Sequence, residues 1–141
     1  MRIQFSVIGE PRGKQRPRYT KTGRVYTPSE TVAYEKRIRS SFLWHIPDEA
    51  HTPVMSGPVR ISIMASYQIP KSASVKQKQA LESMPATKKP DVDNIAKIVM
   101  DGLNKVAYED DKQVVAVDVS KKWSICPGLL ITVEDYEETE Q

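Results

Sequence analysis

The sequence predicts a single α+β domain in which a mixed β-sheet packs against two or three helices. A chain of 141 residues and 16.0 kDa is long enough for one compact core and short for two. In some segments apolar residues alternate with polar ones, and in others they recur every three or four residues, which is typical of half-buried strands and amphipathic helices. Prolines and glycines separate these segments. We therefore expect one domain over residues 1–141, with strands and helices interspersed along the chain.

The N-terminal region predicts a strand followed by a long loop. In the segment RIQFSVIG near the start of the chain, Ile3, Phe5 and Val7 share one face, as in a half-buried strand. Residues 10–28 contain two glycines and three prolines, which favours a loop. Within that loop, residues 22–23 can form the turn of a short hairpin.

Two helices and a second strand are predicted in the middle of the chain. The first helix begins at Thr27 or Ser29, and its apolar residues are Val32, Ala33, Ile38, Phe42 and Leu43. After a loop rich in proline, residues 59–70 alternate again, and one face of that strand holds Val59, Ile61, Ile63, Ala65 and Tyr67. A short basic helix can follow Ser72 or Ser74, because serine is a frequent N-cap residue.

The segment KKPDVDNIAKIVMDGLNKVAYEDDKQVV, residues 88–115, predicts an extended start and then a helix. Pro90 disfavours helical angles at the residue before it, and Asp93 then occupies an N-cap position. The helix should run from Asn94 to about Val106, with a buried stripe of Ile95, Ile98, Val99, Gly102, Leu103 and Val106. Two strands complete the domain: residues 113–123, where Val115, Val117 and Val119 alternate, and residues 128–135.

The opposite side of this helix is a row of polar side chains: Asp93, Lys97, Asp101 and Asn104. Asp91 lies two residues before Asp93 on extended backbone and can reach the same end of the row. Asp110 or Asp111, just before the next strand begins, can also lie close to this row of side chains. We therefore expect several carboxylates to meet near one point.

Each of these acids also has an ordinary structural interpretation. Asp93 can be a helix cap, its pairing with Lys97 can be an i,i+4 ion pair that contributes about 0.3–0.5 kcal/mol, and EDDK can be a turn. Together they fit that interpretation poorly, because neighbouring carboxylates repel one another unless a cation neutralises them. Mg²⁺ binds to a few carboxylates and keeps water and phosphate oxygens in its other positions. The predicted ligands are Asp91, Asp93 and Asp111, with Asp110 as a further candidate.

A divalent ion at these acids predicts the hydrolysis of a phosphodiester. Lys97, one turn along the helix, would offset the negative charge that develops on the transferred group or the leaving oxygen. Asp101 would orient Lys97 or, like Asn94, support the metal ligands without binding the ion. The predicted catalytic residues are therefore Asp91, Asp93, Lys97 and Asp111.

Basic residues concentrate at the N-terminal end. Residues 1–40 contain ten lysines or arginines against three acids, a balance of +7, which attracts polyanions. The candidate DNA-binding residues are Arg12, Lys14, Arg16, Arg18, Lys21 and Arg24, together with Lys121 and Lys122 near the end of a later strand. Tyr19 and Tyr26 can stack on exposed bases. The alternative is a solvated loop without a ligand.

The run KKPDVDNIAKIVMDGLN, followed by YEDDKQVV, resembles the signature of the RusA family of Holliday junction resolvases. The matching elements are KPD, the DN after it, Lys97, the D-x-L-N segment at 101–104 and the DD-x-Q segment at 110–113. The basic N-terminal segment and the first helix also look like those of many relatives. Two departures are Gly102, where many relatives have alanine, and NKVAY in place of an Asn-Gly turn.

This resemblance implies a RusA-like fold and a homodimer that binds four-way DNA junctions. It implies paired, symmetric cuts made with Mg²⁺ or Mn²⁺, in a protein encoded by a bacterium or its prophage. By the same resemblance, Asp91, Asp93 and Asp111 match the essential acids and Lys97 the essential lysine.

We therefore expect a Mg²⁺-dependent, structure-selective DNA endonuclease that resolves four-way junctions in recombination and repair. Two alternatives stay open: a module that binds branched DNA without cutting it, and a metal-dependent phosphohydrolase for nucleotides. No segment is apolar enough for a signal peptide or a membrane span, so the cytoplasm is the expected location. His45 and His51 have no cysteine partners for a zinc site and receive no role. The acidic tail, about 134–141, is expected to be mobile, and Trp44 and Trp123 are expected to be packing residues.

Overall fold

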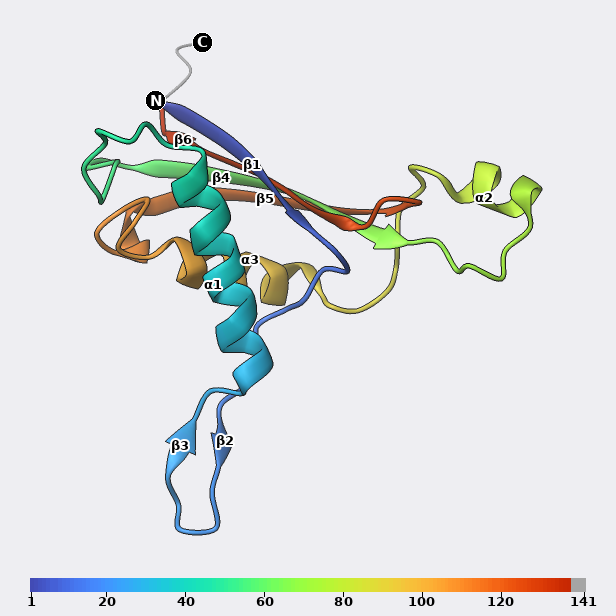
Figure 1. Ribbon diagram of the computed structural model, residues 1–141, viewed down its shortest axis with the longest axis horizontal. Helices are drawn as coiled ribbons and strands as arrows, with labels where there is room; N and C mark the ends of the chain where they lie inside the picture. The colour runs from blue at the N-terminus through green and yellow to red at the C-terminus, as the bar shows by residue number, and fades with distance from the viewer. Residues whose placement is uncertain (138–141) are drawn as a thin grey trace.

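A mixed four-stranded sheet forms the centre of the molecule and confirms the predicted α+β fold of a single small domain (Figure 1). The computed structural model describes residues 1–137. Within them the sheet order is β1-β6-β4-β5, with β1 (Arg2–Ile8), β4 (Val59–Gln68), β5 (Val114–Ser124) and β6 (Gly128–Asp135). The pairs β1–β6 and β4–β6 are antiparallel, and β4–β5 is parallel. Parallel neighbours need a crossover connection, and the chain between β4 and β5 makes it.

Two helices, α1 (Ser29–Trp44) and α3 (Val92–Leu103), pack against each other and against one face of the sheet (Figure 1). The core between these layers includes Phe5, Tyr34, Ile38, Phe42, Ile61, Ile95, Ile98 and Leu129. Burial of one large apolar side chain contributes about 1.5–3 kcal/mol. This layer holds α3 firmly and leaves its polar side facing outward. The alternation predicted for β1 and β4 is confirmed, since both strands bury every second residue.

Two segments project from this body (Figure 1). The predicted hairpin is present as β2 (Arg18–Tyr19) and β3 (Val25–Tyr26), joined to the start of α1, and all residues from 16 to 27 are exposed. The short helix α2 (Val75–Leu81) lies on the second projection and has no buried residue. Ser74 caps it, as predicted, by accepting a hydrogen bond from a backbone amide.

The boundaries and buried faces of the helices differ in part from the expectation. α3 begins at Val92 with Asp91 as N-cap, so Asp93 lies within the first turn and is not the cap. In α1 the buried residues are Thr31, Tyr34, Ile38 and Phe42. Val32, Ala33 and Leu43, which were expected to be buried, are exposed. The inward stripe starts at Thr31 and continues at spacings of three and four, which leaves these three residues outside it.

The alternation expected for β5 is only partly present. Val115 is 56% exposed, because a register shift opposite Val59 and Arg60 makes it the extra residue of a bulge. Val117 pairs with Ile61 on the side of the sheet that faces the helices, but it is 38% exposed because β5 is an edge strand.

The C-terminal strand continues further than the expected start of a mobile tail. Glu134 and Asp135 belong to β6, and Asp135 forms an ion pair of 2.7 Å with the amino group of Met1. Residues 138–141, the rest of the predicted tail, lie outside the described residues. Of the helices in residues 1–137, none is sufficiently long and apolar to cross a bilayer.

Candidate active site

Lys97 lies between two carboxylates on the polar side of α3. Its Nζ is 3.2 Å from Oδ1 of Asp101, one turn further along the helix. It is 3.7 Å from Oδ2 of Asp111, which belongs to the 3₁₀ turn Asp111–Gln113 before β5. The expected contact between Asp101 and Lys97 is thus present. The Lys97 side chain is 53% exposed, so its ammonium can still be reached by a ligand from solvent.

Lys14 joins this group from the N-terminal segment. Its Nζ lies 2.5 Å from Oε1 of Glu35 on α1 and 3.1 Å from Oδ2 of Asp101. The two oxygens of Asp101 therefore each contact a different lysine. Burial alone lowers the pKa of the Lys14 ammonium, but its hydrogen bonds to Glu35 and Asp101 outweigh that effect and leave the pKa above its ordinary value. We expected Lys14 to contact DNA, whereas in the structure two carboxylates engage its ammonium.

Asp91 and Asp93 lie at the start of α3. Asp91 is the N-cap residue, but its side chain makes no capping hydrogen bond, and both carboxylates are exposed. In the part of the chain that the structure describes, neither forms an ion pair. The positive end of the helix macrodipole favours negative charge at this position. Lys97 stands six residues after Asp91, about 9 Å along the helix axis.

Asp110 has a structural role in the turn that presents Asp111. Its carboxylate accepts a hydrogen bond of 2.9 Å from the Lys112 amide, and this bond is the main cause that lowers the pKa of Asp110 below its ordinary value. Gln113 completes the capping box: its Oε1 accepts from two backbone amides, and its Nε2 donates to two carbonyls in the segment before β4. These bonds fix the position of Asp111 relative to α3.

The expected meeting of several carboxylates near one point is not found within residues 1–137: Lys97 lies between Asp101 and Asp111, and Lys14 lies between Glu35 and Asp101. Among residues 1–137, no group of three or more His, Cys, Asp or Glu side chains is close enough together to hold a metal ion. The donor chemistry nevertheless fits a hard divalent cation, because the carboxylates of Asp91 and Asp93 have no competing ion-pair partner in the same range. Asp111 is the third predicted oxygen ligand on this side, and its carboxylate also contacts the Lys97 ammonium.

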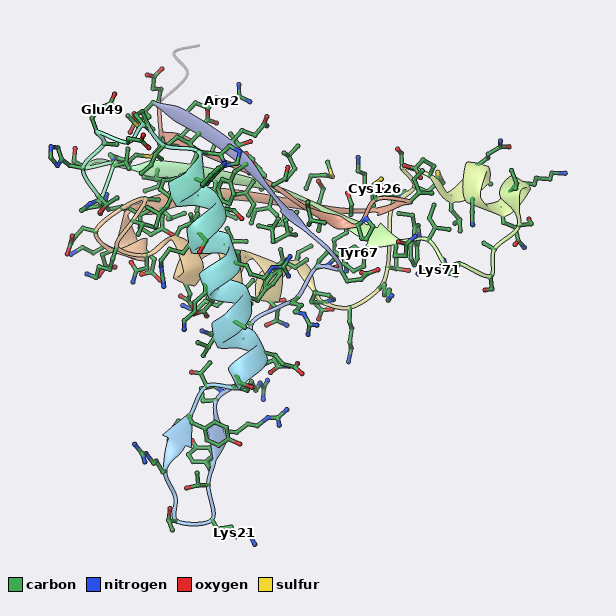
Figure 2. All side chains as sticks on the ribbon, in the orientation of Figure 1. Arg2, Lys21, Glu49, Tyr67, Lys71 and Cys126 are labelled. Atoms are coloured by element: carbon green, nitrogen blue, oxygen red, sulfur yellow. The ribbon has the colours of Figure 1, made fainter. Side chains whose placement is uncertain are left out.

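The hairpin presents cations and aromatic rings without acidic neighbours. Its basic residues are Arg16, Arg18, Lys21 and Arg24, and none of them forms an ion pair within residues 1–137. The sequence has no acid between Glu10 and Glu30. Lys21 lies at the far tip of the hairpin (Figure 2). Tyr19 and Tyr26 are 72% and 45% exposed.

A depression of about 380 Å³ lies between the base of the hairpin and the start of α3. Arg12, which is 3.4 Å from Glu30, lines it together with Lys89, Asp91 and Asn94. The depression therefore joins predicted DNA contacts to a predicted metal ligand.

Lys121 and Lys122, the two candidate DNA contacts near the end of β5, lie on opposite faces of the sheet. Lys121 lies on the face that the helices cover, with its Nζ 5.5 Å from the ring centre of Tyr67. The Tyr67 hydroxyl donates a hydrogen bond of 2.7 Å to the Pro90 carbonyl, and burial is the main cause that raises the pKa of this phenol. Lys121 is therefore close to the start of α3. Lys122, the next residue along the strand, points to the other face of the sheet.

The two tryptophans were expected to pack in the fold, and the two histidines received no role. Trp123 packs against the core, as predicted, but Trp44 is 87% exposed at the end of α1. His45 Nδ1 lies 2.8 Å from the Ser41 carbonyl oxygen, and His51 is exposed.

Comparison with known proteins decides the family. The sequence model described as "Endodeoxyribonuclease RusA" matches residues 9–134, nearly the whole chain. This chain belongs to the RusA endodeoxyribonuclease family. The expected resemblance is thereby confirmed. A relative in Bacillus subtilis (strain 168), described as "Uncharacterized protein YqaN", is 34% identical over 140 residues, which cover 94% of this chain and 96% of the relative. RusA-family membership implies a nuclease of Holliday junctions, and the family depends generally on divalent metal ions.

Two features near these acids were not predicted from the sequence: the contact of Lys14 with Asp101, and the presence of Glu35 beside them. The sequence held one indication, a glycine at position 13 immediately before Lys14, because glycine permits a close approach of two backbones. A Cβ at Gly13 would lie 2.7 Å from Cβ of Pro90 and 2.9 Å from Cβ of Asn94, so only glycine permits this close approach to α3. The Lys14 amide also donates to the Asn94 carbonyl at 2.9 Å.

Proposed function

We propose that this RusA-family chain is a Mg²⁺-dependent endonuclease that resolves four-way DNA junctions by paired, symmetric hydrolysis of phosphodiesters. The observation that supports this most strongly is Lys97 between Asp101 and Asp111, in a chain whose family consists of endodeoxyribonucleases. Phosphoryl chemistry suits an accessible ammonium between two carboxylates, on a helix whose start presents two exposed carboxylates that form no ion pair within residues 1–137.

Asp91, Asp93 and Asp111 would hold the divalent ion, Mg²⁺ or Mn²⁺, with Asp110 as a further candidate. Such an ion supplies Lewis acidity, which withdraws electrons from phosphorus and lowers the pKa of water. Lys97 would lie beside the phosphate and offset the negative charge that develops in the transition state. Asp101 would orient Lys97 through the contact of 3.2 Å, and Asn94, which lines the same depression as Asp91, would support the ligands. Asp110 caps the turn that presents Asp111.

The hairpin would bind the junction through phosphate contacts and stacking. The phosphate contacts would come from Arg16, Arg18, Lys21 and Arg24 of the hairpin, from Arg12 at its base and from Lys121 on β5. Lys122 would contact DNA only from the other face of the sheet. Tyr19 and Tyr26 would stack on bases that are unpaired at the branch point. Phosphate contacts position DNA without reading its sequence, so structure rather than sequence would dominate binding.

A four-way junction has near two-fold symmetry, and paired cuts require two sites related by a two-fold axis. We therefore propose that the active form is a homodimer. Branched DNA arises in the cytoplasm of bacteria and in cells infected by their phages, which is where the protein would act.

Comparison of two substrates and one variant tests this function. The protein should cut a four-way junction in the presence of Mg²⁺ and leave nucleoside triphosphates intact, whereas hydrolysis of the nucleotides would favour a phosphohydrolase. Asp93→Asn should bind the junction and fail to cut it. If wild type also binds without cutting, the chain is a binding module.

A further inference from the structure

Lys14 joins three parts of the molecule through contacts with two carboxylates, which were not expected from the sequence. It follows β1 by a few residues, while Glu35 belongs to α1 and Asp101 to α3, and its ammonium contacts both carboxylates. On the basis of the proposed function, we propose that Lys14 is a positioning residue, which holds Asp101 so that Lys97 stays beside Asp111 and the phosphate to be cut.

The backbone around Lys14 is fixed against α3. The Lys14 amide donates to the Asn94 carbonyl at 2.9 Å. Gly13 lies so close to Pro90 and Asn94 that a Cβ would come within 3.0 Å of both side chains. Because main-chain contacts anchor the segment, the Lys14 ammonium has a defined place.

Close packing of the two helices brings the carboxylates within reach of one ammonium. At Gly102, next to Asp101, a Cβ would lie 3.0 Å from Cγ2 of Ile38 and 3.2 Å from the Glu35 carbonyl oxygen. α1 and α3 therefore approach closely at this point, which places Glu35 beside Asp101.

Electrostatics explains why the ammonium is needed. Glu35 and Asp101 both reach one nitrogen atom, so they lie close to each other and would repel without it. With Lys14 present, Oδ2 of Asp101 has its own cation and Oδ1 is free to contact Lys97. Without Lys14, both carboxylates would compete for Lys97 and draw it away from Asp111. The longer contact of Lys97 with Asp111, 3.7 Å, would be lost first.

The alternative role for Lys14 is a direct phosphate contact like that proposed for its neighbours. The surroundings of the side chains distinguish the two roles. Lys14 is 23% exposed and engaged by two acids, whereas Arg16 and Arg18 are exposed and form no ion pair in the described part of the chain. A phosphate at Lys14 could use only the third donor of an ammonium that two carboxylates already engage.

Lys14→Met and Lys14→Arg test the positioning role, with two readouts for each variant. Dissociation constants for a four-way junction are measured with Ca²⁺ in place of Mg²⁺, and single-turnover cleavage rates are measured at saturating protein with Mg²⁺. We expect Lys14→Met to lower the cleavage rate about 10- to 100-fold while the dissociation constant changes less than about twofold. Lys14→Arg should recover much of the rate, because it keeps a cation between the acids. Thermal unfolding confirms that each variant is folded.

A change in the dissociation constant without a change in the cleavage rate would overturn the proposal. If Lys14→Met weakens binding and leaves the saturated rate unchanged, Lys14 is a phosphate contact. An unchanged rate with unchanged binding would also reject the positioning role, and a wild-type protein that does not cut junctions would reject the proposed function instead.

Two further variants separate positioning from general loss of stability. Combining Lys14→Met with Asp101→Asn should reduce the rate no further than the stronger single change, because both act through the same contact. Independent, multiplicative losses would argue against the coupling. Arg60→Met is the matched control: it removes a cation 3.1 Å from Asp118 on the opposite face of the sheet and should leave both readouts unchanged.

Discussion

At the scale of single residues, two lysines neutralise the acids that cluster around α3. Crowded carboxylates require a cation, and from sequence we expected a metal ion alone to fill that role. In the structure Lys97 and Lys14 supply positive charge between Glu35, Asp101 and Asp111. Lys97 could be placed from sequence, because i,i+4 spacing puts it beside Asp101. Lys14 could not, because its contact depends on how a distant segment folds back onto α3.

Lys97→Met tests whether the central ammonium acts on the transition state. We expect the single-turnover cleavage rate to fall about 100- to 1000-fold, as for the loss of other groups that stabilise developing charge. Junction affinity should stay nearly the same, because many other cations bind the phosphates. A variant that binds weakly but cuts at the wild-type rate when saturated would show that Lys97 only contributes to affinity.

The raised pKa of Lys14 predicts a pH dependence of stability. The unfolded chain has the ordinary lysine value of 10.5, and the folded value is higher. The charged form is therefore favoured by folding, so its stabilisation is complete below the unfolded pKa and disappears as pH rises through the folded pKa. The difference in free energy of unfolding between wild type and Lys14→Met should be constant from pH 7 to 9 and shrink above the unfolded value. Denaturant titrations at these pH values measure it, and a difference that grows with pH would contradict the assignment.

At the scale of elements, local pattern predicted most of the secondary structure. Alternation in β1 and β4, the Ser74 cap and the hairpin turn depend on neighbouring residues, and they are confirmed. The buried face of α1 and the exposure of Val115 depend on which surfaces the elements meet, and these were predicted wrongly. Which side of a helix or strand is buried thus depended on its tertiary contacts, which the periodicity of the sequence does not specify.

The hairpin has no structural task within residues 1–137 beyond its own pairing, so its residues should affect DNA binding and not stability. Tyr19→Ala combined with Tyr26→Ala should weaken junction affinity about tenfold or more, since each stacked base contributes about 1–3 kcal/mol. The melting temperature should be nearly unchanged, because both residues lie on the projecting hairpin, where Tyr19 is 72% and Tyr26 45% exposed. Equal affinity in the variant would exclude stacking by these rings, and a large drop in melting temperature would show that they pack in the fold.

Gly13→Ala tests the close approach of the N-terminal segment to α3. The added Cβ would lie 2.7 Å from Cβ of Pro90, so the segment must shift away. We expect the cleavage rate to fall about 10- to 100-fold, because small displacements of positioning groups are costly in catalysis. Gly57→Ala is the control, since nothing lies within 4 Å of a Cβ there. Wild-type cleavage by Gly13→Ala would mean that the segment is not needed near α3.

At the scale of the whole molecule, the sheet and two helices pack into one body, and a basic hairpin extends from it (Figure 1). The site lies on α3, with the hairpin base and the depression at Arg12 adjoining its start. This arrangement suits a nuclease that holds branched DNA with one element and cuts it with another. The single domain and the family were predictable from sequence, because the motif spacing around α3 is local and specific.

The most direct test incubates the protein with a synthetic mobile four-way junction, with and without Mg²⁺, and maps nicks on all four strands. We expect paired nicks at symmetric positions on opposite strands, only when Mg²⁺ or Mn²⁺ is present, and none with Asp93→Asn. Cutting that persists without a divalent ion, or nicks scattered over duplex and single-stranded DNA, would contradict it.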